Sequence, residues 1–151
     1  MTYQFTAGGH TVTVDESTRV LVTQYRWGVE ANARQVLGMV NGKQLSLHRF
    51  LMNEPKGLEV DHINGDPLDN RLCNLRICTH AENMRNRKMH KNNKCGAKGV
   101  YMDHRKRLNP YRAEIKVDGR KITLGAFATV DAAAQAYRVA SKQYHGEFAR
   151  L

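Results

Sequence analysis

The segment from Val60 to Arg87, VDHINGDPLDNRLCNLRICTHAENMRNR, constrains the fold of this chain more than any other. Residues 58–62 and 75–78 have the composition of short strands, and the NGDP sequence at 64–67 is a turn signal between them. Thr79 and Glu82 have the spacing of a capping box, in which each side chain bonds the backbone N–H of the other residue. The segment therefore predicts a strand, a loop, a second strand, and a helix that begins at Thr79 and runs to about His90.

The same segment brings together side chains suited to hydrolysis of a phosphodiester. Asp61 and His62 end the first predicted strand, and Asn83 falls in the first turn of the helix. A neutral histidine can take a proton from water near pH 7, and carboxylate and amide oxygens bind Mg²⁺. Adjacent residues on a regular strand point to opposite faces, so we expect a strand end or a bulge where Asp61 meets His62.

Positive charge is confined to the second half of the chain. The net charge is +10, yet residues 1–83 hold 8 Lys/Arg and 9 Asp/Glu, whereas residues 84–151 hold 16 and 5. Such asymmetry favours a polyanionic partner, most commonly nucleic acid. The composition, 41% hydrophobic and 25% charged, is that of a globular protein. No apolar run spans a membrane and no signal segment is found, so we expect a cytoplasmic protein with no membrane partner.

The cysteines do not suggest a metal site. Cys73, Cys78 and Cys95 make an odd number and contain no C-x-x-C pair, which structural zinc sites prefer. We therefore expect no zinc, and we interpret the three residues as small, partly buried thiols.

The N-terminal fifty residues read as a β-rich segment. Asn41-Gly42 is the strongest two-residue hairpin signal, because both residues tolerate positive φ. The expected elements are a strand at 10–14, a strand or short helix at 20–25, strands at 35–40 and 43–47, and a short helix at 48–52.

The last fifty residues predict a small antiparallel sheet covered by one helix. Three strands are expected at 99–102, 111–117 and 121–124, followed by an alanine-rich helix from Val130 to His145 that Thr129 caps. Alternation in the middle strand puts Arg112, Glu114 and Lys116 on the face opposite the helix. The whole chain is therefore predicted to be of the α+β class.

The central motif resembles the HNH homing endonucleases of the zinc-free phage type, which have a ββα-metal core. The matching residues are Asp61-His62-Ile63-Asn64-Gly65-Asp66, Asp69-Asn70-Arg71, Asn74-Leu75-Arg76 and Asn83. The resemblance implies His62 as general base, Asp61 and Asn83 as ligands of Mg²⁺ (or Mn²⁺), and Asn74 as the residue that orients the His62 loop. From the residues alone, turn capping explains Asn70 and Asn74 equally well.

The C-terminal segment resembles the DNA-binding domain of plant ethylene-response factors, through Gly99-Val100, Leu124-Gly125, Phe127, Ala132-Ala133 and His145-Gly146. That resemblance implies that the open face of the sheet reads the major groove. Basic residues beside the nuclease motif and in the first hairpin loop are expected to contact phosphate. The predicted DNA-binding residues are Arg85, Arg87, Lys98, Tyr101, Arg105, Lys106, Arg107, Arg112, Glu114, Lys116, Lys121 and Thr123.

Together these features predict a nuclease domain at 1–90, a basic linker at 91–98 and a DNA-binding domain at 99–151. The expected function is metal-dependent cleavage of double-stranded DNA by a monomer or homodimer, of the phage homing type, in a phage-infected or bacterial host cell. The main alternative is a non-catalytic, sequence-specific DNA-binding regulator with a degenerate nuclease core. RNA binding is less favoured, because the open face is charged rather than aromatic.

Overall fold

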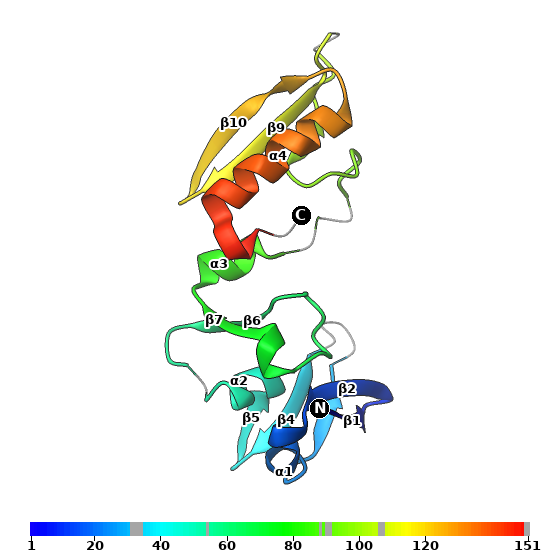
Figure 1. Cartoon of the computed structure of the whole chain (residues 1–151), viewed down its shortest axis with the longest axis vertical. Coiled ribbons are helices and arrows are strands. Elements are labelled where there is room, and N and C mark those ends of the chain that lie inside the picture. Colours follow the sequence, from blue (N-terminus) through cyan, green and yellow to red (C-terminus); the bar gives the residue numbers. More distant parts are fainter. Residues whose placement is uncertain (31–34, 54, 88, 90–91, 106–107, 150–151) are drawn as a thin grey trace. The chain divides into compact units, whose positions relative to one another are not determined.

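The computed structural model describes residues 1–30, 35–53, 55–87, 89, 92–105 and 108–149. Over this part of the chain, strands and helices are mixed, which confirms the α+β class (Figure 1). The Cα atoms cluster into two compact units, Met1–Asn83 and Met84–Leu151. None of the described helices is long and apolar enough to cross a membrane.

Two small antiparallel sheets and two short helices make up the first part of the first unit. The strand expected at 10–14 and the hairpin around Asn41-Gly42 are confirmed. Residues 20–25 contain a helix rather than a strand, and two strands appear that were not predicted, β1 and β3. The elements are β1 (Thr2–Ala7), β2 (His10–Asp15), the 3₁₀ turn η1 (Glu16–Thr18), α1 (Arg19–Val22), β3 (Trp27–Val29), β4 (Val36–Val40), β5 (Lys43–Ser46) and α2 (Leu47–Leu51).

The hairpin between β4 and β5 forms because its two turn residues accept positive φ. Asn41 has φ 49° and Gly42 has φ 79°, the left-handed values that a tight two-residue turn requires. Val40 pairs directly with Lys43 across the turn. The turn thus fixes the register of the sheet from which α2 continues.

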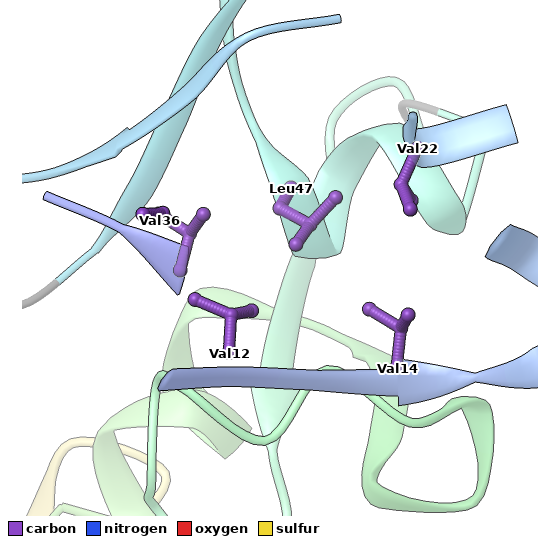
Figure 2. Packing of buried hydrophobic residues seen from close by; sticks show 6 residues of the cluster. Val12, Val14, Val22, Val36 and Leu47 are labelled. Atoms are coloured by element: carbon purple, nitrogen blue, oxygen red, sulfur yellow. The ribbon is translucent and has the colours of Figure 1, made fainter. Parts of the chain in front are cut away.

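The core of the first unit lies between the β1–β2 hairpin and the segments that follow it. Val12 and Val14 alternate along β2 and project from the same side toward Leu47 (Figure 2). All three are fully buried, and Ala7, Val22 and Val36 complete the cluster. Burial of valine and leucine side chains contributes about 1.5–3 kcal/mol each. Leu68, in the loop that follows β6, packs against this cluster.

The predicted strand–loop–strand–helix motif is present. β6 (Glu59–His62) pairs antiparallel with β7 (Leu75–Cys78), the 3₁₀ turn η2 (Leu72–Asn74) precedes β7, and α3 (His80–Arg85) follows it. The Thr79 N–H donates to Glu82 Oε2 at 2.8 Å and the Glu82 N–H donates to Thr79 Oγ1 at 3.3 Å, so the capping box is confirmed.

The expected end of this helix, near His90, is wrong. α3 ends at Arg85, and the Arg87 N–H bonds to the carbonyl of Met84, three residues back, at 3.4 Å. Asn86, a poor helix former, is buried at this point. A tightened last turn of this kind closes the helix after fewer than two turns.

The second unit is a three-stranded sheet with one covering helix. β8 (Val100–Met102), β9 (Tyr111–Val117) and β10 (Arg120–Phe127) lie in the order β10-β9-β8, and α4 (Val130–His145) runs along the sheet (Figure 1). A 3₁₀ turn, η3 (Gly146–Phe148), follows. Thr129 accepts from the Ala132 N–H at 3.2 Å, as its position before the helix predicted. β10 is longer than predicted and is interrupted by a register shift between Thr123 and Gly125.

Small residues let α4 lie close to the sheet. Ala133, Ala134 and Ala140 are buried against β8, β9 and β10, together with Tyr137. Gly99 has φ 71°, and a Cβ there would come within 2.1 Å of the Tyr137 ring. Only glycine fits this position, so the approach of helix to sheet depends on it.

Candidate active site

Asp61 and His62 lie side by side at the end of β6. In the β6–β7 register Asp61 pairs with Arg76 and His62 pairs with Leu75, without a bulge. His62 is the last residue of the strand, so the strand end, one of the two expected arrangements, is the one present. Both side chains are buried, Asp61 with 7% and His62 with 9% of its surface exposed. Ionisable groups so little exposed must be held by specific partners.

Asn70 fixes the tautomer of His62. The Asn70 Nδ2 donates to the carbonyl of Pro67 at 3.0 Å, which turns Oδ1 toward His62 Nε2 at 3.2 Å. An amide oxygen only accepts, so Nε2 must carry the proton. In the neutral ring the lone pair therefore lies on Nδ1, which is the nitrogen able to act as a base.

Burial keeps His62 neutral. Desolvation lowers its pKa below 6.5, although the hydrogen bond that His62 donates to Asn70 and the negative charge of Asp61 oppose the shift. A neutral imidazole near pH 7 is the form that accepts a proton.

His48, from α2, packs edge-on against His62, with ring centroids 4.9 Å apart and planes at 68°. Its Nε2 lies 3.3 Å from Ser46 Oγ, and the residue is buried. Burial, followed by the charge of His62, lowers the pKa of His48 to about 3. His48 is thus a neutral packing partner that supports the position of the His62 ring.

The buried His48 should make stability depend on pH. Its pKa is 6.5 when unfolded and about 3 when folded, so between these values the unfolded chain binds the extra proton and stability falls as pH falls. Lowering pH from 7 to 5 should cost about 2 kcal/mol through this residue. Urea unfolding at both pH values should show that His48→Asn removes this part of the dependence. An unchanged pH dependence in the variant would contradict the assignment.

The loop between β6 and β7 is held by Asn74 and by β2. Asn74 Oδ1 accepts from the Asn64 N–H at 3.0 Å, and its Nδ2 donates to the carbonyl of Asp69 at 2.7 Å. The Asn70 N–H donates to the carbonyl of Thr13 in β2 at 2.7 Å. The hydrogen bonds of the Asn74 side chain described here thus hold the loop, and the side chain that meets His62 is Asn70.

Asp61 forms a buried ion pair with Arg76 on the neighbouring strand. Arg76 Nε and Nη2 donate to Asp61 Oδ2 at 3.0 and 2.8 Å. The two side chains are only 8% and 10% exposed. Such a pair is strongly oriented, because both partners have left water.

Asn83 reaches the same face of β6 from α3. Its Nδ2 donates to Glu59 Oε2, and His80 Nδ1 lies 2.6 Å from Glu59 Oε1. These contacts, the Asn83 bond first, lower the pKa of Glu59. Glu59 and Asp61 are two residues apart on a strand, so they project to one side. Asn83 therefore lies on the side of β6 that also carries Asp61.

The donor set fits a Mg²⁺ ion bound mainly by water and substrate. Asp61 offers carboxylate oxygen and Asn83 amide oxygen, both hard ligands. Among the described residues, no group of three His, Cys, Asp or Glu side chains is placed to hold a metal. Mg²⁺ commonly uses one or two protein oxygens and completes its shell with waters and phosphate. Asp61 and Asn83 are the residues that would hold it.

Several of the residues predicted to bind DNA meet on the open face of the second unit. The strand register pairs Tyr101 with Arg112, Glu114 with Thr123, and Lys116 with Lys121. Directly paired residues point to the same side of a sheet, and buried Ala113 and Ile115 point to the other. The Tyr101 hydroxyl donates to Glu114 Oε1 at 2.6 Å.

The remaining predicted DNA contacts are dispersed. Arg85 Nη2 donates to Asp118 Oδ1 at 3.0 Å, and Lys98 Nζ donates to the carbonyl of Arg85 at 2.7 Å. Arg87 is exposed, and the exposed Arg105 pairs with Asp103 at 3.1 Å. Lys106 and Arg107 lie outside the described residues.

Comparisons with known proteins agree with the central motif. A family model described as HNH endonuclease matches residues 53–85. Protein 3.8 of Escherichia phage T7 is 33% identical over 97 residues, which are 64% of this chain and 78% of that protein. An uncharacterized HNH endonuclease of Acanthamoeba polyphaga mimivirus is 28% identical over 135 residues, 85% of this chain and 67% of that protein. No solved structure matches the chain.

A two-stranded hairpin that carries Asp-His, followed by a capped helix that carries an asparagine, defines a nuclease core of the ββα class. With the matched family model and the viral relatives, the chain belongs to the HNH endonuclease family. The family model ends at residue 85. The resemblance of residues 99–151 to the plant DNA-binding domains, like the division at 90 and 98, stays a prediction.

Proposed function

We propose that the protein is a metal-dependent DNA endonuclease of the phage homing type that hydrolyses one phosphodiester bond at a time. The observation that carries the proposal is the His62–Asn70 contact, because it leaves a buried, neutral imidazole with its lone pair on Nδ1. The relatives from a phage and a giant virus support the viral setting.

In the proposed mechanism, His62 Nδ1 removes a proton from the attacking water. Asn70 Oδ1 remains hydrogen-bonded to Nε2–H and so stabilises the imidazolium that forms. The hydrogen bonds of Asn74 hold the loop in this conformation, so Asn70 Oδ1 stays within hydrogen-bonding distance of His62 Nε2. Asp61 and Asn83 would hold Mg²⁺ (or Mn²⁺), which when bound neutralises charge on the phosphate and on the departing 3′ oxygen.

In this proposal the second unit binds the double-stranded DNA. Lys116 and Lys121 are directly opposite each other on the open face. Like charges in such a pair are unfavourable in the isolated sheet, so an anion between them would relieve the repulsion. Phosphate contacts made by such residues position the duplex, while Arg112, Glu114 and Thr123 beside them are suited to base edges.

One active site per chain cuts one strand per binding event. We therefore expect a monomer to produce nicks, and a double-strand break to need a homodimer or a second event. The product distinguishes these cases, because nicked circles precede linear DNA only when the two cuts are independent.

Incubation with supercoiled plasmid tests the proposal. The protein in Mg²⁺ should convert the plasmid to nicked circles, and EDTA should stop the conversion, since the charge on the scissile phosphate is then not neutralised. Agarose gel electrophoresis measures both. Binding of the plasmid without any nicking in Mg²⁺ or Mn²⁺ would instead support the non-catalytic regulator, and equal nicking in EDTA would contradict the metal requirement.

A further inference from the structure

Glu59 joins the first strand of the nuclease core to two side chains of α3. Its Oε1 lies 2.6 Å from His80 Nδ1, and its Oε2 accepts from Asn83 Nδ2. His80 and Asn83 are three residues apart and so lie on one face of the helix. Each carboxylate oxygen of Glu59 therefore has its own partner on that face.

This contact determines which end of the Asn83 amide is available. A carboxylate oxygen only accepts, so the amide group must present nitrogen to Glu59. The amide oxygen then points away from the carboxylate, and no described residue donates a hydrogen bond to it in the structure. A flipped amide would set oxygen against the carboxylate and lose the bond. A hard divalent cation takes the oxygen and not the nitrogen.

We propose that Glu59 is a positioning residue for the metal site, which fixes the Asn83 amide with its oxygen turned toward the metal. The inference rests on the proposed function. Glu59 itself acts through Asn83, because both of its oxygens are already engaged by α3. His80 holds the second oxygen and so keeps the carboxylate in the plane that suits Asn83.

A purely structural role for Glu59 is separable from this one. The start of α3 is also stabilised by the reciprocal hydrogen bonds between Thr79 and Glu82, which do not involve Glu59. Removing Glu82 should loosen the helix start without touching the Asn83 amide. Glu82→Ala is therefore a matched control for Glu59→Ala, because each variant removes one carboxylate that bonds to the start of α3.

Mn²⁺ binding to the full chain, followed by electron paramagnetic resonance, provides a readout that does not depend on cleavage. Glu59→Ala should weaken Mn²⁺ binding about tenfold or more, as loss of a partner behind a metal ligand commonly does. Glu59→Gln should weaken it less, because its amide oxygen can still accept from Asn83 while its NH₂ group faces His80. Glu82→Ala should bind Mn²⁺ nearly as the wild type does.

A double-variant cycle with Asn83→Ala completes the test. If Glu59 acts through Asn83, adding Glu59→Ala to Asn83→Ala should weaken Mn²⁺ binding no further. Additive losses, or equal losses in Glu59→Ala and Glu82→Ala, would overturn the positioning role while leaving the proposed function intact. Absence of Mn²⁺ binding by the wild type, with no nicking, would overturn both.

Discussion

Replacing His62 with alanine should reduce the nicking rate by about 10²–10⁴-fold, the usual cost of losing a general base. DNA affinity should stay near that of the wild type, because proton abstraction belongs to the transition state and the duplex is held elsewhere. Single-turnover nicking of plasmid and equilibrium binding to a short duplex measure the two quantities separately.

The exposed His10 at the start of β2 offers a matched control. His10→Ala should nick at the wild-type rate, because the side chain lies outside the buried group formed by His48, His62 and Asn70. The nicking rate of Asn70→Ala should lie between those of His62→Ala and His10→Ala. This variant removes the acceptor of the Nε2–H hydrogen bond but leaves the imidazole in place. Wild-type nicking by His62→Ala would show that another group is the base.

The role inferred for Asn70 could not be predicted from the sequence. Asn70 and Asn74 have the same residue type and lie in the same loop, and local rules explain both as turn residues. What separates them is the pairing of the loop with β2, through Thr13, which brings Asn70 and not Asn74 to the ring of His62. Thr13 and Asn70 are far apart in the chain, so local residue spacing could not predict the contact between them.

Local sequence signals were sufficient to predict the structure where the residues of a turn or a helix cap themselves determine the backbone conformation. The Asn41-Gly42 turn, the Thr79–Glu82 box and the Thr129 cap each specify a conformation through the residues themselves, and each is present. β1 and β3 were missed because short strands take their stability from partners, here β2 and β4, rather than from composition. The contacts of Glu59 with His80 and Asn83 were also not predicted, since they depend on how the helix that follows β7 packs beside β6.

The ion pair at Asp61 could not be inferred from the motif either. The family pattern implies a metal ligand at this position, but the register of β6 and β7 adds Arg76 as a buried partner. In the proposed mechanism Asp61 therefore has two roles, which a single substitution would disturb together. A test of the metal role has to separate them.

Asp61→Ala should abolish metal-dependent nicking and also destabilise the fold by about 3–5 kcal/mol, because it leaves the buried Arg76 without its carboxylate. Urea unfolding gives the stability change, and plasmid nicking gives the activity.

The double variant Asp61→Leu/Arg76→Met separates the two roles of Asp61. It replaces the ion pair with apolar groups of similar volume, an exchange that is often neutral or stabilising. It should therefore regain stability near that of the wild type and still fail to nick, because no carboxylate oxygen remains for the metal. Nicking by this double variant would remove Asp61 from the metal site and leave it a structural residue.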